Sequence, residues 1–241
     1  MLKLYSFGPA ANSLKPTLAL YEKGLEFEHK LLNPRLFEHH SDWYKAINPR
    51  GQVPALDDGG RIVTESTVIC EYLEDAHPTD VRLRPESHYD TAQMRVWTKW
   101  VDEYFCWCVS TVGWHRHVSQ MVKHLSDEEF GAMVARVPIP EQRVKWRRAR
   151  EGFPQDLLEE EMRKIGVSVR RLDDRLADNE WLAGGVYSLA DICNFAIAGG
   201  MQNGFPEFVN AHDTPHMFRW IEQIGDRPAV KAMYAAVPRE F

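Results

Sequence analysis

Two short segments of the chain carry residues that could bind a peptide-like ligand. Val53 precedes Pro54 and is therefore pushed toward extended geometry. If the bond between them is cis, the backbone N–H and C=O of Val53 would turn toward an extended ligand. Glu65 could hold an ammonium group, and Ser66 opens a predicted helix whose free N–H groups suit a carboxylate. Together the segments predict a site for a molecule with an amine, a carboxylate and a peptide backbone.

The elements that must position these residues form an α/β pattern in the first third of the chain. Strands are predicted at residues 2–7, 26–32, 53–56 and 61–64, and helices at residues 14–23, 41–47 and 66–76. The turn Asp57-Asp58-Gly59-Gly60 suits a hairpin between the last two strands. The order β-α-β followed by β-β-α predicts a thioredoxin-like sheet of four strands.

The rest of the chain shows only helical periodicity, after a linker at residues 78–85. Helices are predicted at residues 91–122 (one long aromatic helix or a broken pair), 155–177, 188–199, 216–224 and 229–237, with a polar insertion at 126–154. We therefore predict a thioredoxin-like α/β domain at residues 1–78 and an all-α domain at residues 88–241.

Composition argues against several classes of protein. The net charge of −6 does not favour a nucleic-acid partner. No apolar run of about 18 residues is present, and Met1 leads straight into a predicted strand, so we expect no membrane span and no signal peptide. Cys106 and Cys108 are two positions apart and point to different helix faces, unlike a metal-binding CxxC pair. With Cys70 and Cys193 they are expected to be buried thiols in a reducing cytoplasm, and no metal site is predicted.

The residues from Asn48 to Leu56, with Glu65 and Ser66, resemble the glutathione site of the glutathione S-transferases. Ser188-Leu189-Ala190-Asp191, a capping-box variant, also resembles the helix cap found at this place in that family. The resemblance implies the transferase fold, a homodimer, and glutathione as cosubstrate. It implies glutathione contacts from Gln52, Val53, Pro54, Glu65 and Ser66. His39 or His40 would supply a cation or donor for the glycine carboxylate, and we choose His40.

A transferase of this kind must stabilise the glutathione thiolate, because the thiolate is the nucleophile. Tyr5 lies near the donor of tyrosine-type members, although a strand aromatic packed in the core explains it equally well. The serine of the plant serine-type classes falls on Ala10, which has no donor. Asn12 and Ser13 remain, and an asparagine at this spacing resembles yeast prion-type transferases. We predict that Ser13 and Asn12 stabilise the thiolate, and either could also be a plain helix cap.

A closer resemblance, to the bacterial β-aryl etherases of lignin catabolism and most of all to their β(S)-selective branch, extends over nearly the whole chain. It is carried by residues 2–9, 48–56, 65–74, 94–112 and 138–153. It implies that glutathione thiolate attacks the carbon β to an aryl ketone and that a phenolate such as guaiacol leaves. An aromatic substrate needs an aromatic wall, and Tyr104, Trp107, Thr111 and Trp114 recur at helical spacing beside the expected glutathione site. Ordinary core packing is the alternative for each of them.

The sequence is also compatible with other functions. The glutathione-site residues fit a general transferase or a peroxidase of another specificity equally well. A non-enzymatic glutathione-binding protein is a second alternative, although the presence of Glu65 and of donors near Asn12 disfavours it. A translation or scaffolding module built on the same fold is a third.

Overall fold

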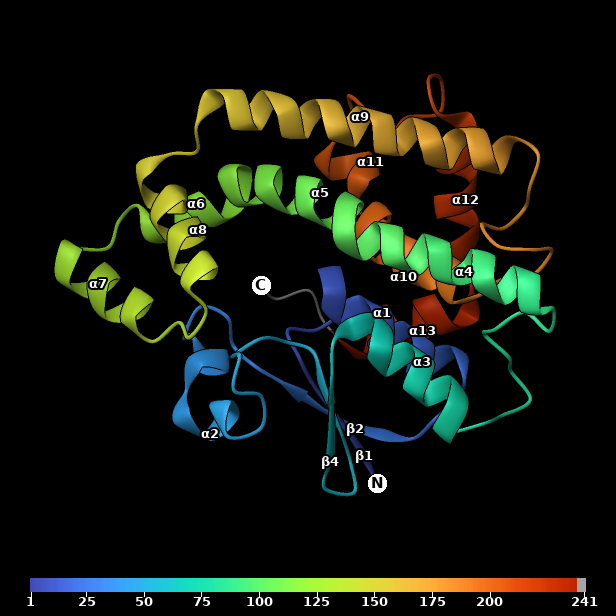
Figure 1. Cartoon of the computed structure of the whole chain (residues 1–241), viewed down its shortest axis with the longest axis horizontal. Helices are drawn as coiled ribbons and strands as arrows, with labels where there is room; N and C mark the ends of the chain where they lie inside the picture. The colour runs from blue at the N-terminus through green and yellow to red at the C-terminus, as the bar shows by residue number, and fades with distance from the viewer. Residues whose placement is uncertain (238–241) are drawn as a thin grey trace.

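A four-stranded sheet organises the first domain of the computed structural model, which describes residues 1–237 (Figure 1). Its strands are β1 (Leu2–Ser6), β2 (Phe27–Leu31), β3 (Ala55–Asp58) and β4 (Arg61–Thr64), in the spatial order β2-β1-β3-β4. β1 and β2 are parallel, whereas β3 is antiparallel to both β1 and β4. The predicted thioredoxin-like topology is confirmed. Gly59 and Gly60, both at positive φ, form the predicted hairpin turn.

The two faces of the sheet are covered by different helices because side chains alternate along a strand. Leu2 and Leu4 of β1 belong to the main core, which includes residues of α1 (Ala11–Glu22) and α3 (Ser66–Ala76). Tyr5 points to the other face and packs in a cluster with Tyr44 of α2 (Asp42–Lys45). α1 begins three residues earlier than the sequence predicted, at Ala11, whose φ is 45°.

The second domain is helical, as predicted. Its helices are α4 (His88–Trp100), α5 (Cys106–Gly113), α6 (Ser119–Val122), α7 (Asp127–Ala135), α8 (Pro140–Glu151), α9 (Gln155–Ala177), α10 (Leu189–Ala198), α11 (Met201–Gly204), α12 (Pro215–Gly225) and α13 (Pro228–Ala236). The predicted aromatic helix is continuous from α4 to α6 but contains π-helical turns at Val101–Phe105 and Trp114–Val118. The polar insertion folds into α7 and α8. Residues 238–241, the end of the predicted helical domain, lie outside the described residues.

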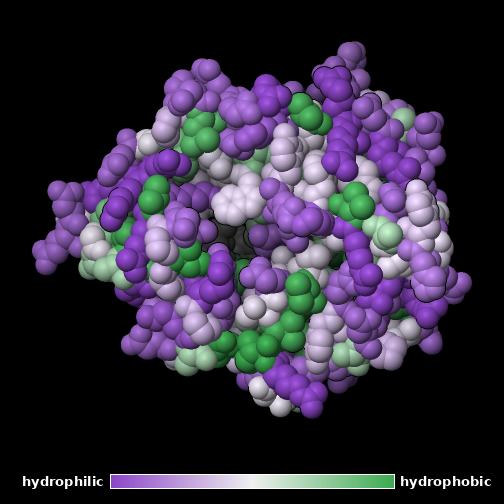
Figure 2. Space-filling view, in the orientation of Figure 1, coloured by the Kyte–Doolittle hydropathy of each residue, from purple (hydrophilic) through white to green (hydrophobic). Residues whose placement is uncertain are grey.

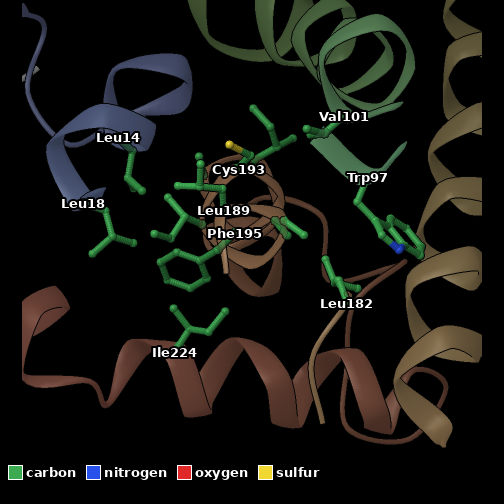
Figure 3. Packing of buried hydrophobic residues seen from close by; sticks show 14 of the residues in the cluster. Leu14, Leu18, Trp97, Val101, Leu182, Leu189, Cys193, Phe195 and Ile224 are labelled. Carbon is green, nitrogen blue, oxygen red and sulfur yellow. The ribbon is translucent and has the colours of Figure 1, made fainter. Parts of the chain in front are cut away.

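The main core is centred on α10, every residue of which is buried (Figure 3). Leu14 and Leu18 of α1 approach it from the first domain, while Trp97 of α4 and Ile224 of α12 approach from the second. The predicted capping box is present at Ser188. Its partner Asp191 also accepts hydrogen bonds from the Leu182 N–H and the Trp220 indole, both at 3.0 Å. The buried carboxylate therefore joins the start of α10 to α12.

Lys15 and Phe37 are two of the residues through which the first domain contacts the helical domain. Lys15 of α1 is fully buried and forms an ion pair with Asp102 in the first π turn. Arg136 donates a 2.9 Å hydrogen bond to the carbonyl of Phe37. Phe37 in turn packs into a second, smaller core, the α7–α8 core, formed by Phe37, Val122, Phe130, Val134, Val137, Trp146, Ala149, Phe153 and Leu158. No helix within residues 1–237 combines the length and apolarity needed to cross a membrane.

Candidate functional site

Two adjoining cavities lie between the domains, and the molecular surface is hollowed near the middle of the face shown in Figure 2. The polar cavity, of about 450 Å³, is lined from the first domain by Asn12, Asn48, Arg50, Gln52, Val53, Pro54, Glu65 and Ser66. From the second domain it is lined by Asp102, Cys106, Trp107, Ser110, Ile139, Glu141, Gln142 and Lys145.

The apolar cavity, of about 340 Å³, is lined by Phe7, Pro34, His39, His40, Arg50, Gly51, Gln52, Val53, Trp114, Val118, Met121, Val137, Gln142 and Trp146. Arg50, Gln52, Val53 and Gln142 line both cavities, so the two adjoin along these residues.

The segment before β3 forms the predicted backbone ledge. The Val53–Pro54 peptide bond is cis. Tyr44 Oη and Asn48 Nδ2 each donate a 2.7 Å hydrogen bond to the carbonyl of Gln52, which fixes the preceding backbone. Within residues 1–237 the N–H and C=O of Val53 make no hydrogen bond. They are thus available to an extended ligand, the arrangement seen when a peptide pairs with backbone.

Glu65 and Ser66 lie together on the wall of the polar cavity, at the start of α3. Glu65 has a φ of 67°, which is uncommon for a residue with a side chain and costs backbone energy. Its carboxylate has no ion-pair partner among the described residues. A charged carboxylate beside the unpaired N–H groups of a helix start can hold an ammonium and a carboxylate of one ligand.

Asn12 and Ser13 are placed differently, although they are neighbours in α1. Asn12 lines the polar cavity, and its Nδ2 lies 3.6 Å from Cys106 Sγ. Ser13 is buried behind the wall, where its Oγ accepts a 3.4 Å hydrogen bond from the N–H of Phe7. Tyr5 packs against Trp43 and Tyr44, in line with the core alternative. Of Tyr5, Asn12 and Ser13, only Asn12 therefore presents a donor to the polar cavity.

His40 lies on the apolar cavity and not among the residues that line the polar one. Its ring is 3.9 Å from that of His39, centroid to centroid. Burial lowers the pKa of His40 to about 4 and that of His39 to about 3, so both rings are neutral near pH 7. A Cβ at Gly51 would lie 2.5 Å from His40 Nδ1, so only glycine fits there. Of the two roles expected for His40, cation or donor, a neutral ring fits the second, because it can donate one hydrogen bond.

The predicted aromatic wall is half present. Trp107 lines the polar cavity and Trp114 the apolar one. Tyr104 lines neither cavity and stacks on Trp100, with ring centroids 6.4 Å apart. Thr111 also lies off the cavities, and its Oγ1 donates a 3.0 Å hydrogen bond to the Trp107 carbonyl. For Tyr104 the physical reason is the π turn at Val101–Phe105, because Tyr104 lies within it and the wider turn changes the face that Tyr104 shares with Trp107.

Several residues that the sequence did not assign to the site line the polar cavity, and three of them could act on a ligand: Arg50, Cys106 and Lys145. Arg50 directly follows Asn48-Pro49 in the ledge segment, and its Nε donates a 3.3 Å hydrogen bond to Gln52 Oε1. Cys106 was expected to be a buried thiol but is only half-buried, and desolvation still raises its pKa. Lys145 donates a 2.8 Å hydrogen bond to Ser110 Oγ from the basic run of the insertion, which gave no sign of its position.

The polar cavity thus offers a carboxylate, a helix start, a free backbone ledge, a guanidinium and an amide donor. A thiol-containing peptide with a free amine and two carboxylates matches this set group by group. Within residues 1–237 no cluster of three or more His, Cys, Asp or Glu side chains could hold a metal ion.

Comparisons with known proteins agree with this chemistry. Residues 1–75 match the family model "Glutathione S-transferase, N-terminal domain", and residues 109–228 match "Glutathione S-transferase, C-terminal domain". The chain is 58% identical to Protein LigF of Sphingobium sp. (strain NBRC 103272 / SYK-6), over 99% of this chain and 95% of LigF. It is 26% identical to glutathione S-transferase 3 of Zea mays, over 98% of this chain and 95% of that protein.

Solved structures with this fold also match the chain. A crystal structure of the β-etherase LigF from Sphingobium sp. strain SYK-6 matches with a TM-score of 0.95, covering 98% of this chain and 99% of that one. A glutathione transferase homologue from Sulfitobacter with bound glutathione matches with a TM-score of 0.71 at 19% identity, covering 98% of each chain. At that lower identity the likeness concerns the fold alone.

Proposed function

The chain belongs to the glutathione S-transferase family, and we propose that it is a glutathione-dependent β-etherase. The observation that carries the proposal is a polar cavity suited to glutathione that adjoins the apolar cavity with its aromatic rings, in a chain 58% identical to LigF. We take residues 1–78 as the glutathione-binding domain and residues 88–241 as the domain that completes the site for the second substrate.

Glutathione is the cosubstrate, and each of its charged groups has a partner in the polar cavity. The γ-glutamyl amine pairs with Glu65, and the adjoining carboxylate accepts hydrogen bonds from Ser66 and the start of α3. The cysteinyl backbone pairs with Val53 on the ledge beside Pro54. Arg50 is the cation for the glycine carboxylate, with Gln52 as a second donor and neutral His40 as a third at the edge of the apolar cavity.

The thiol end of glutathione lies at the start of α1 in this proposal. Asn12 donates its amide to the sulfur and so favours the thiolate over the thiol. Ser13 supports the same loop from behind through its contact with the Phe7 N–H. No metal or redox cofactor is needed for attack by a thiolate.

The reaction is a displacement at the carbon β to an aryl ketone. The sulfur forms a bond to that carbon, the bond from carbon to the aryl ether oxygen breaks, and the electron pair leaves with a phenolate such as guaiacol. The enzyme aligns the two reactants and holds the thiolate. The apolar cavity, with Trp114, Phe7 and Trp146 on its walls, suits one aryl ring, and Trp107 borders the path between the cavities. Tyr104 and Thr111, which line neither cavity, are not part of the proposed substrate site.

We further propose that one β enantiomer, the β(S) form, is consumed. Attack comes from the glutathione side, so the leaving aryl group must point away from the sulfur. With the ketone fixed in its place, only one configuration satisfies both conditions.

The experiment is the cleavage of a racemic β-guaiacyl aryl ketone in the presence of glutathione, followed by chiral chromatography. We expect guaiacol and a glutathione thioether, with conversion reaching a plateau near half as one hand is exhausted. Equal consumption of both hands would contradict the single-enantiomer proposal. No guaiacol release, alongside good activity on generic electrophiles, would make the chain an ordinary transferase.

We also propose a homodimer in the cytoplasm. Val68 on α3 and Tyr89 and Val96 on α4 are exposed apolar side chains on neighbouring segments, which suits an interface between copies. All four cysteines are free thiols, as in a reducing compartment. Light scattering during size exclusion tests the dimer, and a monomer at micromolar concentration would contradict it.

A further inference from the structure

Lys145 occupies an unusual position for a lysine. It projects from α8 onto the wall of the polar cavity, where its half-buried side chain donates a 2.8 Å hydrogen bond to Ser110 Oγ. Its ammonium lies 4.6 Å from the ring centroid of Trp114 and 5.7 Å from that of Trp107. The cation is thus held by two ring faces and one hydroxyl.

No carboxylate among the described residues forms an ion pair with Lys145. Glu141 lines the same cavity without pairing with it, and Glu161 of α9 acts on it only as a more distant charge. Burial lowers the pKa of Lys145 to about 8, so its charge is held against a desolvation cost. A cation that faces a cavity without a counter-ion is well placed to receive a negative oxygen from a ligand.

The position of Lys145 within the cavity indicates which part of a ligand it faces. Cys106 lies 3.6 Å from the Asn12 amide, and the ring of Trp107, the next residue along the chain, carries the Lys145 ammonium on its face. Lys145 therefore lies at the thiol end of the cavity. The two carboxylates of glutathione already have Ser66 with the start of α3, and Arg50, as partners.

We propose that Lys145 is a catalytic residue that donates a charged hydrogen bond to the aryl ether oxygen as the carbon–oxygen bond breaks. This inference rests on the proposed β-etherase function. As sulfur bonds to the β carbon, the electron pair of the breaking bond moves onto the aryl oxygen, and the ammonium stabilises the resulting phenolate. The rings of Trp107 and Trp114, which already hold the ammonium, also offer faces on which the departing aryl group can stack.

The first test measures phenolate binding and needs no turnover. The glutathione site is filled with S-methylglutathione, which cannot react, and bound 4-nitrophenol is titrated by its absorbance. We expect the wild-type protein to lower the apparent pKa of the bound phenol by about one to two units relative to solution. Lys145→Met should abolish this shift and Lys145→Arg should keep most of it. Arg148→Met, which removes an exposed cation from the same helix, should leave it unchanged.

The second test compares ethers whose phenols differ in acidity. A leaving group of low acidity depends most on the ammonium, so Lys145→Met should slow such substrates about ten- to a hundredfold and slow acidic phenols much less. The glutathione Kd should change less than twofold. A uniform loss across all leaving groups would overturn the proposal.

Two further results separate the possibilities. If Lys145→Met raises the pKa of the bound glutathione thiol and leaves the nitrophenol titration unaltered, the ammonium serves the sulfur and the proposal is wrong. If the wild-type protein cleaves no ether at all, the proposed function fails, while the nitrophenol titration still decides whether Lys145 binds a phenolate. Thermal midpoints equal to that of the wild-type protein establish that Lys145→Met and Lys145→Arg are both folded.

Discussion

Replacement of Asn12 by alanine should raise the pKa of the glutathione thiol bound to the protein. The amide is the only group of the Asn12–Ser13 pair on the cavity wall, and Nδ2 lies 3.6 Å from the one sulfur already beside it, Cys106 Sγ. A hydrogen bond to a charged acceptor contributes about 1.5–3 kcal/mol, and one pKa unit corresponds to about 1.4 kcal/mol. Because the cavity is open to water, the lower end applies. We expect a rise of about one unit and about a tenfold slower reaction at neutral pH, with partial recovery in alkali.

The assay is an ultraviolet titration of the thiolate of bound glutathione, with turnover measured across the same pH series. Ser13→Ala is the matched control, because it removes a hydroxyl one residue away that faces the protein interior. It should shift the thiol pKa less than Asn12→Ala does and should mainly lower stability. A larger shift in Ser13→Ala than in Asn12→Ala would refute the reasoning from the cavity wall. An unchanged pKa in both variants would remove the pair from the mechanism.

Three more outcomes follow from the structure. Glu65→Gln should weaken glutathione binding by about 1.5–3 kcal/mol without unfolding the protein, and an unchanged Kd in calorimetric titration would contradict the assigned ammonium contact. The thermal midpoint should fall as the pH drops from about 6.5, because His39 and His40 stay neutral in the folded state while the unfolded chain takes up their protons. Scanning calorimetry at several pH values tests this, and an equal pH slope in His40→Gln would exclude His40 as a source. Asp191→Asn should lower the free energy of unfolding by about 3 kcal/mol, because the new NH₂ group would face a donor, such as the Trp220 indole N–H, where a carboxylate oxygen now accepts. A loss below about 1 kcal/mol in urea denaturation would contradict the stabilising role of this carboxylate.

The fold could be predicted from the sequence because its signals are local. Alternating apolar residues located the strands, the Gly59-Gly60 turn joined two of them, and the capping box at Ser188 marked the start of α10. The ledge at Val53 was predictable for the same reason, since its geometry depends on the following proline.

The second half of the site could not be predicted because it depends on tertiary structure. Spacing alone placed Tyr104 on the face of Trp107, but the π turn that contains Tyr104 is not visible in the sequence and changes the face that this residue occupies. Lys145 belonged to a run of basic residues, and nothing local indicated that α8 would lay this one over the polar cavity. Likewise, no sequence pattern distinguished the exposed side of Asn12 from the buried side of Ser13.

The separate packing of the α7–α8 core has a consequence for how this protein can evolve. Ile139, Gln142 and Lys145 line the cavities from a segment whose apolar side chains, including Trp146, pack mostly among themselves and not around α10. Mutations in this segment can reshape what the cavities admit while the buried framework that supports α10 stays intact. Substrate range and folding stability are therefore encoded in largely different residues, and a lineage can explore new aromatic ethers without first acquiring a more stable scaffold.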